Sequence, residues 1–191
     1  MIQMRGLFKK VKKTMINKTI KPILFNTEDV KAILDGKKNK TTRVFSKTQL
    51  KYFDYAQKLG EMSSLDNLHE NDFAYILQFS QYKVGDVLWV REPAKVKSPP
   101  IATCKKLTFK YLADNKITEI YLDDDFDYSK KWIQRCQGVP NGCIKEMARI
   151  FLKVTNVKFE RLQYIGNKDL KFVFVYEFEK VEKYYRKQRR I

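Results

Sequence analysis

One stretch near the end of the chain limits the fold more than any other. Residues 172–178 read Phe-Val-Phe-Val-Tyr-Glu-Phe, so that six of seven successive side chains are apolar or aromatic. A strand with this pattern must be covered on both faces, which places it inside a sheet. The chain has 191 residues with 13 Phe and 11 Tyr, enough bulk for one globular core around such a strand.

The remaining patterns predict further strands and two helices around this strand. Short β-branched and aromatic runs predict strands over 21–25, 41–45, 87–92, 107–113, 117–122 and 148–159, with a weaker one over 73–79. Apolar spacing predicts helices over 27–35 and 48–59. Residues 60–72 and the Pro-Pro segment at 99–100 are expected to be loops. This order predicts an α+β domain built on a small mixed β-barrel with two or three flanking helices.

The charge is typical of a protein with a polyanionic partner or, equally, of a surface of solvated lysines, and it is unevenly distributed along the chain. The chain has 39 Lys and Arg against 22 Asp and Glu, a net charge of +17. Residues 1–21 contribute +7 and residues 180–191 contribute +5. We therefore expect a basic amphipathic arm at 1–20, a domain at 21–182 and a basic tail at 183–191. The arm could lie on nucleic acid, on an anionic membrane surface or on its own domain, or it could be a poorly ordered extension.

Metal sites and disulfides are not expected. Cys104, Cys136 and Cys143 are too few and too irregularly spaced for a disulfide framework. A zinc site would need His69, the only histidine, as a fourth ligand, so ordinary thiols are the favoured interpretation. The acidic run 123–127 could hold a hard cation but is favoured as a solvated loop. We expect neither a metal nor a cofactor.

Two motifs carry the chemical information. Residues 36–43 read Gly-Lys-Lys-Asn-Lys-Thr-Thr-Arg, between a helix that Asn26 caps and the strand at 41–45. Residues 85–92 read Gly-Asp-Val-Leu-Trp-Val-Arg-Glu. In this order the two segments resemble the ASCH domain of the PUA-like superfamily, in its long form common in phage genomes. Segments 148–154, 160–163 and 174–179 extend the resemblance over residues 21–182.

The resemblance implies a small β-barrel with a cleft that binds RNA or modified nucleobases. A short bacterial member is an amidohydrolase on N4-acetylcytidine, with Lys, Thr and Glu as its catalytic set. The Lys and Thr of this motif fall on Lys38 and Thr41, and the motif Arg falls on Arg43. The helix that carries the Glu in the family has no counterpart here, because residues 161–169 lead almost directly into the last strand.

The site residues expected from this resemblance form two sets. A catalytic set would use Thr41 as the nucleophile and Lys38 as its base, with Glu92 as a substitute acid and Glu28 or Asp35 as alternatives. A nucleic-acid-binding set has cationic or aromatic side chains in common: Lys37, Lys38, Lys40, Arg43, Trp89 and Arg91. A solvated basic turn and a core position for Trp89 are the plain structural alternatives. Adjacent on a strand, Arg91 and Glu92 should point to opposite sides.

The function expected first is binding of nucleic acid, RNA rather than DNA, or of a modified nucleobase. Its alternatives are an amidohydrolase on an N-acylated cytidine-type nucleoside, and a phage structural or accessory protein that docks a partner through its basic termini. No run of about 18 apolar residues is present, so no membrane-spanning helix is expected. The expected location is the cytoplasm, that of the host cell if the protein is phage-encoded.

Overall fold

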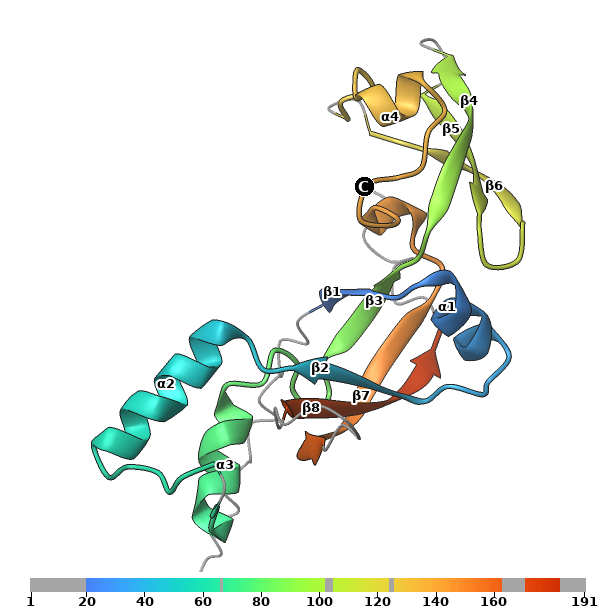
Figure 1. Cartoon of the computed structure of the whole chain (residues 1–191). Helices are drawn as coiled ribbons and strands as arrows, with labels where there is room; N and C mark the ends of the chain where they lie inside the picture. Colours follow the sequence, from blue (N-terminus) through green and yellow to red (C-terminus); the bar gives the residue numbers. More distant parts are fainter. Residues whose placement is uncertain (1–19, 66, 102–104, 124–125, 163–170, 183–191) are drawn as a thin grey trace, which may run out of the picture.

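Two β-sheets and four α-helices make up the described part of the chain. A computed structural model describes residues 20–65, 67–101, 105–123, 126–162 and 171–182. The predicted arm, the tail, Cys104 and the segment 163–170 lie outside these residues. Figure 1 shows the smaller sheet with α4 (Lys131–Gln134) at one end of the molecule, and α2 (Lys47–Lys58) and α3 (Glu70–Gln78) at the other.

The larger sheet has five strands in the order β1-β3-β7-β8-β2. Its strands are β1 (Ile20–Leu24), β2 (Lys40–Val44), β3 (Val87–Arg91), β7 (Phe151–Leu162) and β8 (Lys171–Val181). β1 pairs with β3 in parallel, and the other pairs are antiparallel. Among the described residues, β1 and β2 are the two edges, and no ladder joins them.

The apolar strand predicted from the sequence is confirmed as β8. It lies between β7 and β2, away from the edges. Phe174, Tyr176 and Phe178 point into the main core, while Val173 and Val175 are buried on the opposite face. The predicted alternation of β3 also holds, because Leu88 and Val90 belong to the main core. Val87 packs instead with partly buried Trp89 in a small separate cluster.

Two helices begin at caps that the sequence encodes. α1 (Thr27–Leu34) starts after Asn26, whose side chain accepts a hydrogen bond from the backbone N–H of Asp29 at 2.7 Å. α2 starts after Ser46, which forms a reciprocal capping box with Gln49. Both predicted helices are confirmed.

The strand predicted over 73–79 is wrong, because these residues form most of α3. The Asp72 carboxylate accepts hydrogen bonds from the backbone N–H groups of His69 and Ser63, which fixes the first turn of a helix. Ile76 is then fully buried, and Phe79 packs edge-on against Phe53 of α2 at 5.3 Å between ring centroids. Packing of one helical face therefore outweighs the β propensity of this segment.

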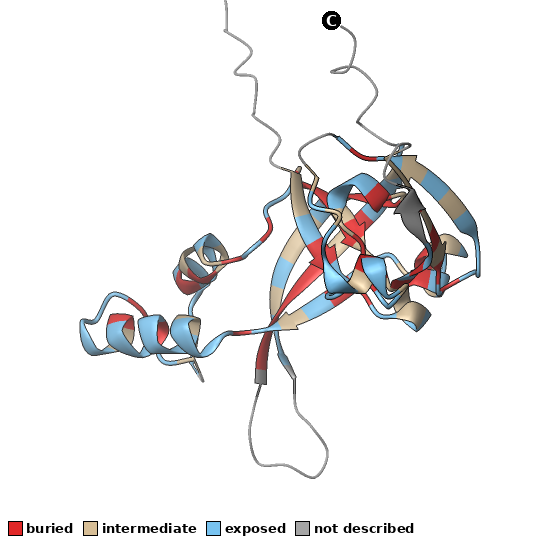
Figure 2. Cartoon of the chain, turned by 90° about the horizontal axis from the view of Figure 1, so that it is seen from above, coloured by how far each residue is buried: buried red, intermediate tan, exposed pale blue. Residues whose placement is uncertain are grey.

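The smaller sheet has its own core, separate from that of the larger sheet, and buried residues lie in both parts of the molecule (Figure 2). Its strands are β4 (Ala94–Ile101), β5 (Lys106–Tyr111) and β6 (Ile117–Tyr121), in the order β4-β5-β6. The strands predicted near β5 and β6 are confirmed, whereas the loop predicted at 99–100 is wrong. The two prolines lie in β4, an edge strand with register shifts after Val96 and Ser98, where a missing N–H is tolerated.

The α+β class is confirmed by this architecture. Three helices, α1 to α3, accompany the five-stranded sheet, while α4 and a 3-10 turn at Lys145–Met147 accompany the smaller one. The predicted strand at 148–159 begins at Phe151, because Ala148 still closes the 3-10 turn. Within the described ranges, we find no helix with the length and apolar character needed to cross a membrane.

Candidate functional site

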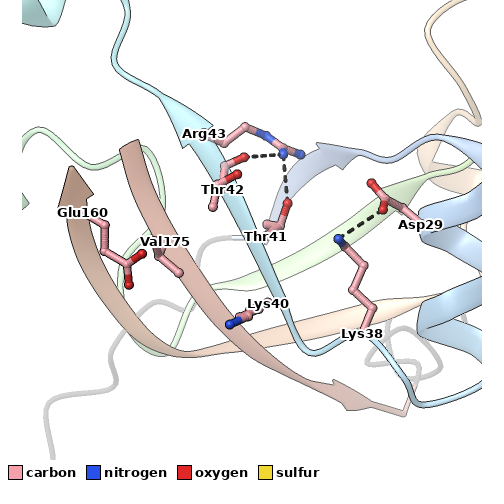
Figure 3. Close-up of a pocket in the computed structure, with 8 residues that line it drawn as sticks. All are labelled: Asp29, Lys38, Lys40, Thr41, Thr42, Arg43, Glu160 and Val175. Carbon is pink, nitrogen blue, oxygen red and sulfur yellow. Dashed lines mark hydrogen bonds and ion pairs between the residues drawn. The ribbon is translucent and has the colours of Figure 1, made fainter. Parts of the chain in front are cut away.

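A pocket of about 350 Å³ lies over β2, next to the start of α1. Figure 3 shows its lining, which comes from α1, the turn after it, β2, β7 and β8. The lining residues combine cations, carboxylates and hydroxyls with one apolar side chain: Asp29, Lys38, Lys40, Thr41, Thr42, Arg43, Glu160 and Val175. Four of the sequence-predicted site residues, Lys38, Lys40, Thr41 and Arg43, therefore meet in one place.

The turn between α1 and β2 places Lys38 in this pocket. Gly36 adopts φ +71°, a left-handed conformation that ends the helix and reverses the chain. The backbone N–H groups of Lys37 and Lys38 then donate back to Ala32 O at 2.8 and 3.1 Å. This fold-back brings Lys38 Nζ to 3.1 Å from Asp29 Oδ1, and both side chains are largely shielded from solvent.

Arg43 joins the two edge strands of the large sheet. Its Nη2 donates to the carbonyl oxygen of Leu24, at the end of β1, at 2.8 Å. Its Nη1 donates to Thr41 Oγ1 at 3.0 Å and to the carbonyl oxygen of Thr42 at 2.9 Å, within β2. The guanidinium also lies 5.5 Å from the centre of the Phe25 ring. Arg43 thus lines the pocket while most of its donors bind the protein itself.

The polar groups behind Arg43 are buried and paired. Tyr176 is fully buried, and its hydroxyl accepts a hydrogen bond from Ser80 Oγ at 3.0 Å. The Tyr82 hydroxyl donates to the carbonyl oxygen of Pro22 in β1 at 2.8 Å. Burial raises the pKa of both phenols, and the charge of Arg43 opposes this rise. These hydrogen-bonded hydroxyls are therefore neutral, buried groups near the Arg43 guanidinium on the core side.

Thr41 and Lys40 sit differently in the pocket. Thr41 is only 6% exposed, and its hydroxyl is held by Arg43. Lys40 is exposed and pairs in register with Glu177 of β8. Hydrogen bonds from Lys158 and Asn156 lower the pKa of Glu177, with a smaller contribution from Lys40. Lys40 is therefore the lining cation most open to a ligand.

Two lining carboxylates were not predicted as site residues. Asp29 is in the first turn of α1 and holds Lys38. Glu160 lies on β7 and is exposed. The alternatives Glu28 and Asp35 do not line the pocket, because Glu28 pairs with Lys31 and Asp35 pairs with Lys37. Thr42 and Val175, which face each other across the β2–β8 ladder, complete the unpredicted lining.

The structure does not bring the other predicted residues to this pocket. Lys37 is exposed beside it and pairs with Asp35 at 3.3 Å. Trp89 and Arg91 lie together on β3, with the Arg91 guanidinium 5.9 Å from the Trp89 ring centre. The Nη2 of Arg91 lies 3.5 Å from the carbonyl oxygen of Pro140, a contact to the loop before β7. These two side chains form a separate group on β3, the strand next to the edge strand β1.

Glu92 occupies a buried ion network between the two sheets. It has no exposed surface, and both of its carboxylate oxygens accept hydrogen bonds from Arg149 at 2.8 Å. Arg149 also donates to Asp114 at 2.6 and 3.1 Å and stacks 3.8 Å from the ring centre of Tyr111. Burial raises the pKa of Glu92 despite Arg149, whereas the hydrogen bond from Arg149 lowers that of Asp114.

Metal ligands do not gather in the described ranges of the chain. Within them, no three His, Cys, Asp or Glu side chains are close enough to share an ion. Cys143 is a buried thiol whose pKa is raised to about 12 by burial, and Cys136 is a free thiol as well. Comparison of the chain with protein-family models, curated proteins and solved structures gives no match.

Proposed function

We propose that this protein binds RNA or a modified nucleobase in the pocket over β2. The observation that carries the proposal is the meeting of Lys38, Lys40 and Arg43 with Thr41 and Thr42 in one hollow. Lysine and arginine bind phosphate oxygens, and hydroxyls can donate to or accept from sugar and base edges. Single-stranded nucleotides offer all of these groups at once.

The size and depth of the pocket fit one nucleobase or nucleoside. Its volume of about 350 Å³ is at the lower end of the roughly 300 to 1,000 Å³ typical of small-ligand sites. Val175 is buried and adds the one apolar side chain to a lining that is otherwise polar or charged. The net charge of +17 adds attraction for a polyanion that does not depend on sequence.

The ASCH-like architecture is part of this proposal. The motif residues Lys38, Thr41 and Arg43 meet at a seam between the edge strands β1 and β2, which Arg43 spans by its bond to Leu24. This bond between the two edge strands supports a barrel-like arrangement of the five-stranded sheet as part of the proposal. The same cleft would then serve RNA rather than duplex DNA, because an unstacked base can enter a hollow and a paired one cannot.

Replacing Lys40 with alanine tests the pocket directly. Because Lys40 is exposed in the lining, its loss should weaken binding of a labelled single-stranded RNA by up to about fivefold at low salt. The slope of log K against log salt should flatten by about 0.7, the contribution of one phosphate contact. Fluorescence anisotropy over a salt series measures both, with single-stranded and duplex DNA as comparison ligands.

Lys116→Ala is the matched control for this substitution. Lys116 is an exposed lysine in the turn between β5 and β6, on the smaller sheet. Its loss removes the same charge far from the pocket and should leave the slope unchanged. Equal effects of the two substitutions, or no RNA binding by the unaltered protein at low salt, would contradict the proposed function.

An amidohydrolase remains the second candidate, and one contact favours it. Arg43 Nη1 donates to Thr41 Oγ1 at 3.0 Å, an arrangement that stabilises the hydroxyl oxygen as it develops negative charge. Asp29 and Glu160 also line the pocket, and a carboxyl group in this position could donate a proton to the leaving amine. Against this, Lys38 Nζ is held by Asp29 Oδ1 at 3.1 Å, so its amine is already engaged in an ion pair.

Substitution of Thr41 decides between these two functions. If Thr41 is the nucleophile, the protein should release cytidine from N4-acetylcytidine, and Thr41→Ala should lower the rate at least about 1,000-fold. Thr41→Ser should retain much of the rate, and Thr155→Ala, which removes an exposed threonine of β7 outside the pocket lining, should change it little. Chromatography of the nucleoside products measures this; absence of turnover in the unaltered protein rejects the hydrolase.

A further inference from the structure

The outward face of α2 carries an unusual set of exposed side chains. Tyr52 and Tyr55 are 56% and 61% exposed, and Leu59 after the helix is 54% exposed. Phe53 and Ala56 of the same helix are buried in the main core. Phe53 and Ala56 fix the helix to the core, whereas Tyr52 and Tyr55 keep more than half of their surface exposed. Exposed aromatic groups that gather on one surface commonly mark a binding site.

Lysines alternate with these rings along the helix. Lys51, Tyr55 and Lys58 lie at spacings of four and three, which places them on one stripe, with Lys47 one turn earlier. Tyr52 lies three residues before Tyr55 on the adjacent stripe, and its ring centre is 5.9 Å from that of Phe79. Lys58 pairs with Asp54 at 2.8 Å. Neither Lys47 nor Lys51 has an ion-pair partner in the described part of the chain.

We infer that this face of α2 is a second contact surface for single-stranded RNA, on which bases stack against Tyr52 and Tyr55 while Lys47 and Lys51 bind phosphates. Single-strand binding surfaces combine aromatic rings with cations in this way, because every base has a stackable face. Protein interfaces, in contrast, are depleted in lysine, so the charge on this helix favours the nucleic acid.

The helix α2 follows β2, the strand that lines the pocket, directly in the chain. β2 carries Lys40 and Thr42 and leads through Phe45 and Ser46 directly into α2 (Figure 1). From Thr42 to Tyr55 the chain covers no more than about 30 Å, at about 3.3 Å per extended and 1.5 Å per helical residue. One strand of several nucleotides could contact both. This inference rests on the proposed function for the identity of the ligand.

Oligonucleotide length separates the two contact surfaces. We expect Tyr55→Ala to lower the affinity for a labelled single-stranded RNA of about twelve nucleotides at least about fivefold. This is the loss expected when one stacked base loses its aromatic partner. It should leave a trinucleotide that fills only the pocket unaffected. Tyr55→Phe should bind both RNAs normally, because the ring is retained. Tyr121→Ala, which removes a 72% exposed tyrosine from β6, is the matched control.

Crosslinking supplies an independent measurement. Ultraviolet irradiation of the complex followed by peptide mass analysis should place nucleotide adducts on the peptide that contains Tyr52 and Tyr55. Unchanged affinity of Tyr55→Ala for the longer RNA, while Lys40→Ala still weakens it, would overturn this surface and leave the pocket intact. That result would also be expected if α2 docked a protein. Failure of the unaltered protein to bind either RNA would reject the proposed function instead.

Discussion

Replacing Arg149 with methionine is expected to lower the free energy of unfolding by about 3 to 5 kcal/mol. The substitution leaves Glu92, which has no exposed surface, without the two hydrogen bonds that hold its carboxylate. Asp114 loses its two bonds from Arg149 as well, but it keeps the bond from the Lys116 backbone N–H, is partly exposed and can be hydrated. Urea denaturation followed by circular dichroism measures the loss.

The loss of stability in the Arg149→Met variant should become smaller as the pH falls. Burial already raises the pKa of Glu92 with Arg149 present, and without Arg149 only the nearby Asp114 carboxylate remains as a charged neighbour, which raises it further. The native variant then binds a proton at higher pH than the unfolded chain, whose carboxyl titrates near 4.5. The variant should therefore gain stability as the pH falls from neutrality through its native pKa toward 4.5.

Two controls distinguish an unpaired charge from a general loss of packing. Lys153→Met breaks an exposed pair with Glu179 and should cost no more than about 1 kcal/mol. The double substitution Glu92→Met and Arg149→Met removes both buried charges and should recover most of the lost stability. A single Arg149 variant as stable as the Lys153 variant would contradict this account of the network.

Gly142→Ala is expected to destabilise the protein by about 2 to 5 kcal/mol. Gly142 has φ +78°, and an added Cβ would lie 2.6 Å from the carbonyl oxygen of Arg91 and 2.9 Å from its carbonyl carbon. Both the left-handed backbone and the contact with a strand backbone oppose the methyl group. Neither can be relieved by rotation of a side chain.

Gly60→Ala separates these two causes. Gly60 has nearly the same backbone angle, φ +73°, but an added Cβ would meet nothing within 4 Å. Gly60→Ala should therefore lower the free energy of unfolding only by the cost of the left-handed backbone, about 1 to 2 kcal/mol. Denaturant midpoints of the two alanine variants give the comparison. Equal losses would mean that the segment around Gly142 moves away from β3 without cost.

Local sequence signals predicted the elements that depend on neighbours in the chain. The apolar run of β8, the Asn26 and Ser46 caps, and the turn at Gly36 all act within a few residues. The meeting of Lys38, Lys40, Thr41 and Arg43 could be predicted for the same reason. Asp29 could have been found too, since the fold-back of that turn returns Lys38 to the first turn of α1.

Contacts between distant segments could not be predicted in this way. Glu160 reaches the pocket because β7 has an irregularity between Val154 and Asn156, which changes which residues share a face. Arg149 lies 57 residues from Glu92, and no local pattern links them. The strand predicted in place of α3 failed because a buried carboxylate, Asp72, caps the helix through backbone groups.

The chain enters and leaves the part that holds the smaller sheet at two neighbouring points. That sheet leaves the larger one after Glu92 and returns at Arg149, and the adjacent Val90 and Ile150 are joined by a backbone hydrogen bond of 3.0 Å. Residues 93–148 are thus a module inserted between neighbouring strands, with entry and exit side by side. Such an insert can be lengthened, trimmed or exchanged as a unit, while the pocket over β2 keeps its geometry.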